Sequence, residues 1–276
     1  MKFVDYVPPV ALTAVRRLRS GSGRKQYASH SEAVADCAAR ADATADSAGV
    51  VVAKTQRYRD ELLRARHSAP ITATNAYSLC ALLAVLDQEV VHVLDFGGAA
   101  GAHYFLTRAI LPFSRGLNWT VVETPEMVER ARPVLSSDEL SFSSNVLEAA
   151  SRLGRIDLLH TSGTLQCVGN PHDALQTLLS VSPQFILFNR LGLTTGDHDV
   201  ITVHEAWLSW NGPGPMPSGI ADRKIRSPFV FPRESVFMEQ LGKNYEIVMT
   251  FEDASGAFPV GQEPIKGLGL LAKRKA

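Results

Sequence analysis

The chain has 276 residues, 45% of them apolar, with 28 basic and 28 acidic side chains and a formal net charge of zero. This length suits one large α/β domain, alone or with a smaller attachment, and the balanced charge gives no reason to expect a nucleic-acid-binding protein. No apolar run has the length of a membrane span, and the N-terminus lacks the order of a signal peptide. Three widely separated cysteines, Cys37, Cys80 and Cys167, indicate buried thiols in a reducing compartment, so we expect a cytoplasmic protein.

Residues 1–70 are predicted to form a basic lead followed by a helical cap. The first 25 residues carry six Lys and Arg side chains against one Asp. A short helix is expected over 10–19, with either a solvated basic face or a weak contact with an anionic membrane surface. Further helices are expected over 31–47, 51–66 and 73–86.

From residue 89 onwards the pattern alternates between short apolar strands and amphipathic helices. Strands are predicted over 89–96, 118–123, 139–144, 155–162 and 184–190, and helices over 103–111, 125–135 and 171–182. Such alternation predicts a parallel sheet with helices on both faces. The Gly-, Pro- and Trp-rich residues 191–231 interrupt the alternation and are interpreted as a substrate lid inserted in a ligand-binding domain over 71–276. A helix over 232–242 and two antiparallel strands over 245–253 and 267–275 complete that domain.

A glycine-rich turn follows the first predicted strand, in the sequence "VLDFGGAAG" (93–101). Parallel α/β sheets bind ligands at the carboxyl ends of their strands, where glycines let the backbone approach the ligand and the next helix presents free N–H groups. The spacing of Gly97, Gly98 and Gly101 does not match the G-x-G-x-x-G pattern of dinucleotide-binding proteins. Asp95 at the end of the strand completes a different pattern.

This turn resembles the first motif of the Rossmann-like (class I) S-adenosylmethionine-dependent methyltransferases, D-x-G-x-G-x-G. Asp95, Gly97 and Gly101 match it, whereas Ala99 replaces the middle glycine. The resemblance implies an α/β fold with a seven-stranded, mostly parallel sheet, an antiparallel last strand, helices on both faces, and S-adenosylmethionine as the cofactor. The residues that it places around the cofactor are Asp95, Phe96, Gly97, Gly98, Ala99, Gly101, Tyr104, Glu123, Thr124, Thr161, Ser162 and Gly163.

Glu123 ends the second predicted strand, where an acid can accept hydrogen bonds from both ribose hydroxyls of a nucleoside. The alternative is a surface Glu that favours the start of the next helix through its dipole. Thr161, Ser162 and Gly163 end the fourth strand, which in the methyltransferases lies beside the methionine part of the cofactor. Tyr104 either closes over the cofactor or packs in the core.

A narrower resemblance runs from about Lys25 to the end of the chain. Its most specific segments are "GAHYF" (101–105) and "SGTLQ" (162–166). In these segments, and in the order in which they occur, the chain is similar to a family of bacterial methyltransferases associated with O-antigen and other surface-polysaccharide gene clusters. The resemblance implies a small-molecule or saccharide-linked acceptor. The chain departs from the family at Ala99 and at His204, where glutamine is expected.

Methyl transfer from a sulfonium needs the acceptor atom held in line with the departing sulfur, and a hydroxyl or amine acceptor must also lose a proton. His204, in the predicted lid, is the first candidate for the base, with a solvated loop His as the alternative. His160, at the end of the fourth strand, either acts in the cleft or packs in the sheet. Arg190, at the end of the fifth strand, is expected to hold an anionic group of the acceptor or to form a structural salt bridge. No metal is expected, because the adjacent side chains of Asp197–Asp199 cannot converge on one ion.

Two other functions stay open. A binding or scaffold protein that keeps the fold without turnover is favoured by Ala99, whose methyl group would narrow the space beside a cofactor. A nicotinamide-dependent oxidoreductase is disfavoured by the glycine spacing. The helical N-terminal third could instead form a dimer interface, so the oligomeric state stays open.

Overall fold

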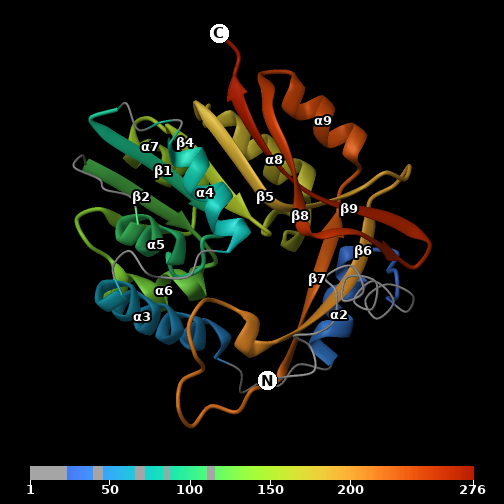
Figure 1. Cartoon of the computed structure of the whole chain (residues 1–276). Coiled ribbons are helices and arrows are strands. Elements are labelled where there is room, and N and C mark those ends of the chain that lie inside the picture. Colours follow the sequence, from blue (N-terminus) through green and yellow to red (C-terminus); the bar gives the residue numbers. More distant parts are fainter. Residues whose placement is uncertain (1–23, 40–45, 66–71, 84, 86–87, 111–115) are drawn as a thin grey trace, which may run out of the picture.

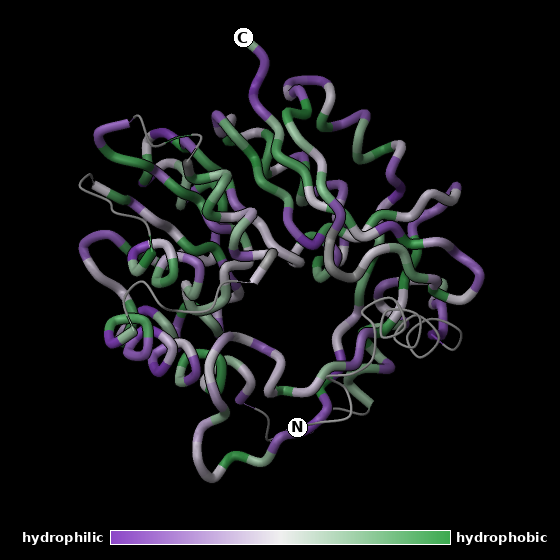
Figure 2. Tube along the Cα trace, in the orientation of Figure 1, coloured by the Kyte–Doolittle hydropathy of each residue, from purple (hydrophilic) through white to green (hydrophobic). Residues whose placement is uncertain are grey.

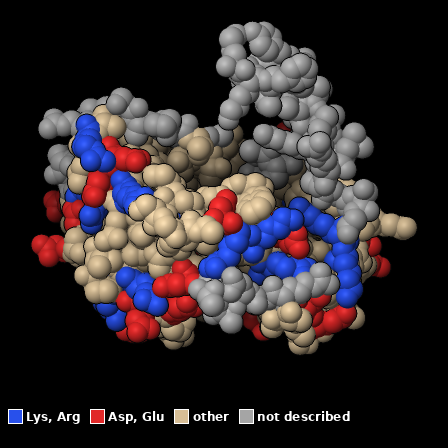
Figure 3. Space-filling view, turned by 90° about the horizontal axis from the view of Figure 1, so that it is seen from below, with Lys and Arg blue, Asp and Glu red and all other residues tan. Residues whose placement is uncertain are grey.

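The structure is a computed structural model that describes residues 24–39, 46–65, 72–83, 85, 88–110 and 116–276 (Figure 1). The helix expected over 10–19, with its membrane contact, lies outside the described residues. Among the described helices, none combines the length and the apolar character that crossing a bilayer requires. Basic and acidic side chains lie close together on the face in Figure 3, in keeping with the zero net charge.

A seven-stranded sheet forms the centre of the molecule. Its strands are β1 (Val90–Phe96), β2 (Gly116–Val122), β3 (Leu140–Ser143), β4 (Leu158–Ser162), β5 (Phe185–Thr194), β8 (Tyr245–Val260) and β9 (Glu263–Arg274). Their order is β3-β2-β1-β4-β5-β9-β8, parallel from β3 to β5, with β9 antiparallel to both β5 and β8. The predicted mostly parallel, Rossmann-like sheet with an antiparallel last strand is confirmed. The strand order reverses between β1 and β4, which is where such sheets bind ligands.

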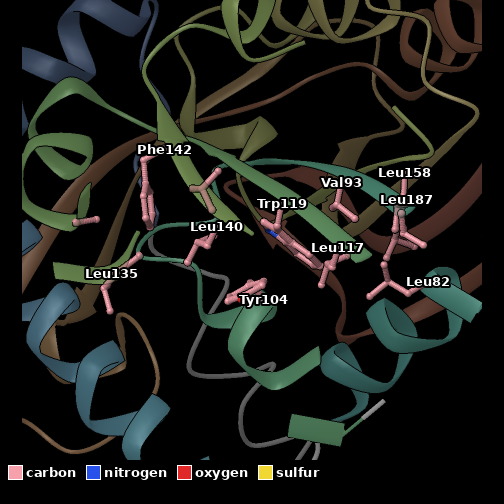
Figure 4. Close-up of a cluster of buried hydrophobic side chains, with 14 of the residues drawn as sticks. Leu82, Val93, Tyr104, Leu117, Trp119, Leu135, Leu140, Phe142, Leu158 and Leu187 are labelled. Atoms are coloured by element: carbon pink, nitrogen blue, oxygen red, sulfur yellow. The ribbon is translucent and has the colours of Figure 1, made fainter. Parts of the chain in front are cut away.

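Helices cover both faces of this sheet, as predicted. They are α3 (Ser47–Ala65), α4 (Ala73–Leu83), α5 (Ala102–Ile110), α6 (Pro125–Leu135), α7 (Val146–Leu153), α8 (Pro171–Ser180) and α9 (Glu234–Gly242). A further helix, α2 (His30–Ala39), packs instead on residues 200–207 and 224–231. One buried cluster joins the sheet to α3, α4, α5 and α6 (Figure 4), and a second joins it to α7, α8 and α9. In Figure 2 the strands of the sheet are among the most hydrophobic segments, drawn in green.

Local residue chemistry explains where several helices begin and end. Thr124 caps α6 with its side chain, and Pro125 takes the first turn, where a missing N–H costs nothing. The sequence did not predict α7, a short helix that Asn145 caps and Gly154 ends in a left-handed conformation. Eight residues give too little periodicity to distinguish a helix from a loop.

The region 191–231 is more regular than expected. Its first four residues belong to β5, and β6 (Val200–Trp207) pairs with β7 (Lys224–Phe231) in a separate two-stranded antiparallel sheet. We call residues 200–231 the β6–β7 hairpin. Its alternating side chains pack on α2 through Val203, while many glycines and prolines lie in its long tip. The expectation that these residues are irregular was therefore wrong, because the turn residues dominate the sequence pattern around the two strands. Their role as a substrate lid stays a prediction.

The expectation of three buried thiols was also wrong. Cys37 is buried, but Cys80 and Cys167 are exposed, and all three are free.

Candidate functional site

The glycine turn after β1 touches the loop after β4. Gly97 (φ +72°) and Gly101 (φ +81°) adopt left-handed backbone conformations that favour glycine. A Cβ added to Gly97 would lie 2.0 Å from Oγ1 of Thr164, and that hydroxyl donates a hydrogen bond to the Gly97 carbonyl at 3.3 Å. Only glycine therefore allows the two loops to meet at the switch point of the sheet.

Ala99 occupies a left-handed conformation with φ +51°, where an alanine costs about 1 kcal/mol. This explains why glycine is usual in such a turn. The alanine packs against the buried cluster beneath α5. Its backbone N–H donates to Oε1 of Glu123 at 3.1 Å.

Glu123 follows β2 directly, and its half-buried carboxylate lies beside the glycine turn. In addition to the Ala99 N–H, it accepts a hydrogen bond from the N–H of Thr124 at 2.9 Å. Burial raises the pKa of Glu123, and these backbone donors partly oppose that rise. The structure thus brings together the two elements that sequence analysis placed around a cofactor, the glycine turn and the acid after the second strand.

Asp95 lies beneath the turn in a buried polar network. Its carboxylate accepts from His160 Nδ1 at 2.7 Å and from Trp119 Nε1 at 3.2 Å. The Nε2 atom of His160 lies 2.9 Å from Ser78 Oγ, and Asn189 donates to the same hydroxyl at 3.4 Å. Burial alone would raise the pKa of Asp95, but the His160 imidazole lowers it below its usual value. Both nitrogens of His160 are thus engaged within the protein.

Three further residues belong to this site and were not predicted from the sequence: Ser78, Asn189 and Thr164. Ser78 comes from α4, Asn189 from β5 and Thr164 from the loop after β4. Ser78 contacts His160, Asn189 contacts Ser78, and Thr164 contacts Gly97. These contacts join distant parts of the chain, so no local pattern marks the three residues.

His103, in the first turn of α5, faces Asp95 from the other side. Its Nδ1 lies 3.9 Å from Asp95 Oδ2, and burial lowers the pKa of His103 to about 4, so its ring is neutral near pH 7. Asp95, His103 and His160 offer ligand atoms within 4.8 Å of one another. Two imidazoles and a carboxylate are a donor set that suits zinc or iron. The 2.7 Å separation of Asp95 and His160, however, is that of a hydrogen-bonded pair.

Tyr104 does not close over the turn. Its ring is buried in the core beside Trp119 (Figure 4), and its hydroxyl donates to Oε2 of Glu139 at 2.9 Å. Of the two roles considered for Tyr104, the structure shows packing in the core, because α5 directs this side chain towards the sheet.

Arg190 and the end of β4 form a second part of the site. Arg190 has a left-handed backbone (φ +53°) at a bulge within β5, so it does not end that strand as predicted. Its Nε donates to Ser162 Oγ at 3.0 Å and its Nη2 to the Ser162 carbonyl at 2.9 Å, while Gln166 Nε2 donates to the Arg190 carbonyl at 3.1 Å. Gly163 leaves room for the guanidinium, since an added Cβ would lie 3.2 Å from Arg190 Cζ. Thr161 is buried, and successive strand residues alternate, so it faces the side of the sheet opposite His160.

His204 lies on β6, stacked on Phe229 with ring centroids 4.7 Å apart. Burial, and to a smaller degree the Arg24 charge, lower the pKa of His204. Within the described part of the chain, no recorded contact joins it to the glycine turn or to Glu123. The hairpin does reach the site, because β7 packs against the short 3-10 helix η3 (Leu165–Cys167) after β4.

No protein-family profile matches this sequence, and no curated protein matches it. Among solved structures, the chain is similar to the N-terminal domain of EvdMO1 with SAH bound, at 15% identity over 80% of this chain and 95% of that chain, with a TM-score of 0.46. It is also similar to SAM-bound CalS10, an amino pentose methyltransferase from Micromonospora echinaspora, at 13% identity over 92% and 100% of the two chains, with a TM-score of 0.44. The N-methyltransferase NodS from Bradyrhizobium japonicum, in complex with SAH, has 13% identity over 81% and 100%, with a TM-score of 0.41. At these identities and TM-scores the likeness supports no conclusion about activity, which depends on the site itself.

The fold is that of an α/β protein with a Rossmann-like sheet, and the candidate site lies at the switch point of that sheet. A carboxylate lies under the glycine turn of that site and another lies beside it.

Proposed function

We propose that this chain is an S-adenosylmethionine-dependent methyltransferase that acts on a small-molecule or saccharide-linked acceptor. The observation that carries the proposal is the position of the Glu123 carboxylate. It lies beside the glycine turn, and one of its oxygens accepts a hydrogen bond from the Ala99 N–H. A carboxylate after the second strand of such a sheet is the acceptor that ribose hydroxyls require.

The charge of the site favours this cofactor over a nicotinamide dinucleotide. Asp95 is buried directly against the turn, where a Cβ on Gly98 would lie 2.3 Å from its Oδ2. Its lowered pKa keeps it ionised near neutral pH. A pyrophosphate at the turn would meet the negative charge of Asp95, whereas a sulfonium and an ammonium group would be attracted to it.

The remaining predicted contacts fit the same arrangement. The backbone of the glycine turn would contact the cofactor at Gly97, Gly98, Ala99 and Gly101. Ser162 and Gly163 would lie near its methionine part. Phe96, Thr124 and Thr161 flank these positions. Bound S-adenosylmethionine would supply the methyl group that is transferred.

On the acceptor side we propose His204 as the base, Arg190 as the holder of an anionic group, and His160 as a positioning residue for Asp95. The lowered pKa of His204 keeps its ring neutral near pH 7, as a base requires. Ser162 fixes the guanidinium of Arg190 in one direction. The exposed Trp207 and Trp210 near the hairpin tip offer faces that suit sugars.

The resemblance to methyltransferases of surface-polysaccharide gene clusters supports a role in bacterial polysaccharide biosynthesis in the cytoplasm. We further propose that residues 1–70 form a cap and 71–276 the cofactor-binding domain, with the β6–β7 hairpin inside it. The packing of α3 against α5 and α6 supports a cap beside the cofactor end of the sheet.

Calorimetric titration with S-adenosylmethionine tests this proposal. Glu123→Gln keeps the shape of the side chain but removes the charge that strengthens its hydrogen bonds to ribose, so we expect affinity to fall about ten- to a hundredfold. The control is Glu126→Gln, an exposed Glu in the first turn of α6, which should bind as the wild type does. Equal affinities of the two variants would contradict the proposal.

A further inference from the structure

A fully buried lysine lies in α3, outside the residues of the candidate site. Lys54 of α3 has 0% exposure, and its Nζ donates to the carbonyls of Ser209 at 2.6 Å and Asn211 at 2.7 Å. Both acceptors belong to the tip of the β6–β7 hairpin, in and after the 3-10 helix η4 (Leu208–Trp210). The charge is not paired directly with a carboxylate among the described ion pairs, although Asp222 of the same tip attracts it.

The tip lies against α3 along two turns of the helix. A Cβ on Gly212 would lie 3.2 Å from Val51 Cγ1, and one on Gly214 (φ +83°) would lie 2.9 Å from the Lys54 carbonyl oxygen. Arg57 Nη1 also donates to the Met216 carbonyl at 3.0 Å. The hairpin tip therefore packs closely on α3 at its two glycines and is hydrogen-bonded to α3 by Lys54 and Arg57.

Through these contacts α3 joins the two halves of the proposed site. It packs against α5 and α6, which follow β1 and β2, while β7 of the hairpin packs against η3 after β4. Figure 1 shows α3, the tip and the two hairpin strands framing the region towards which β1, β4 and β5 point.

The energetics indicate what the lysine supplies. Burying an ammonium group is costly, and an apolar side chain of similar size often gives equal or greater stability. What an apolar side chain could not do is fix two backbone carbonyls through charge-assisted hydrogen bonds.

We propose that Lys54 is a positioning residue that latches the tip of the β6–β7 hairpin to α3, and so holds the acceptor-side wall closed over the cofactor end of the sheet. Ligand exchange then requires this latch to open. The second part rests on the proposed function, whereas the latch itself does not.

The test compares two glycines of the same loop. Gly214→Ala places a methyl group against the Lys54 carbonyl, whereas Gly219→Ala has the same left-handed backbone (φ +81°) with nothing within 4 Å. Lys54→Met removes the donor while keeping the length of the side chain. Hydrogen–deuterium exchange of residues 208–223 and stopped-flow dissociation of S-adenosylhomocysteine are measured on the full chain for all three variants and the wild type.

We expect Gly214→Ala and Lys54→Met to speed both the exchange of 208–223 and ligand dissociation about tenfold, the effect of losing about 1.4 kcal/mol of closing energy, relative to Gly219→Ala. Unchanged exchange in both variants would overturn the latch. Faster exchange with wild-type dissociation would show that the hairpin does not cover the ligand, which also overturns the proposal. If the wild type binds no S-adenosylhomocysteine, the proposed function fails, and the exchange data still decide on the latch.

Discussion

The glycine turn and the β6–β7 hairpin are positioned by different kinds of interaction. The turn is continuous with a central strand, and a buried network of Asp95, His160 and Trp119 lies under it. The hairpin is a separate two-stranded sheet, and contacts with α2, η3 and α3 hold it in place. A site built in this way can keep its cofactor part rigid while its acceptor part moves, because the hairpin can shift without unfolding the sheet.

The largest expected effect is on the buried network. Asp95→Ala leaves the His160 and Trp119 donors buried without their acceptor, so we expect the free energy of unfolding in urea to fall by about 3 to 5 kcal/mol. In the wild type the lowered pKa of Asp95 means that this stabilisation is present above the ordinary Asp pKa and is lost as pH falls through the folded-state value. Lowering the pH should therefore reduce the free energy of unfolding less in the Asp95→Ala variant than in the wild type.

The exposed Asp138→Ala serves as the control and should unfold as the wild type does. Equal unfolding free energies for the Asp95 and Asp138 variants would show that the turn does not depend on its network.

A second prediction concerns the contact between the turn and the β4 loop. Gly97→Ala should lower the free energy of unfolding by about 2 to 4 kcal/mol. The new methyl group would clash with Thr164, and the alanine would also have to adopt a left-handed backbone conformation. Gly154→Ala has nearly the same φ but nothing within 4 Å, and should cost about 1 kcal/mol. The difference between the two unfolding free energies measures the contact itself, and its absence would mean that the loops do not meet.

A smaller effect is expected at Ala99. Ala99→Gly relieves a left-handed alanine but makes the unfolded chain more flexible, so we expect a net stabilisation of about 0.5 kcal/mol. Urea unfolding measures it. A clear loss of stability would mean that the packing of Ala99 on the core outweighs its backbone strain.

The smallest effect on global stability is expected at the hairpin. Asp222→Ala removes the acceptor of the Ser209 N–H at 2.9 Å and of its hydroxyl at 2.7 Å, both on the exposed tip. We expect faster hydrogen exchange around Ser209 and an unchanged urea midpoint. A lower midpoint would show that the hairpin is as integral to the fold as the turn, and the contrast between the two regions would disappear.

The same contrast explains what could be predicted from the sequence. The turn could be predicted because Asp95 to Gly101 are consecutive, and Glu123 because it ends an apolar strand. The two hairpin strands were not predicted, since the glycines and prolines of the tip dominate the pattern around them. Ser78, Asn189 and Lys54 could not be found, because their roles depend on contacts with residues far away in the chain, such as the Lys54 contact with Ser209.

The central claim is that the switch point binds S-adenosylmethionine and its demethylated product S-adenosylhomocysteine, and not a dinucleotide. Parallel calorimetric titrations of the wild-type chain with S-adenosylhomocysteine and with NADH test it most directly. We predict saturable one-to-one binding of S-adenosylhomocysteine and none of NADH at the same concentrations. Tight binding of NADH, with no heat from S-adenosylhomocysteine, would contradict the claim.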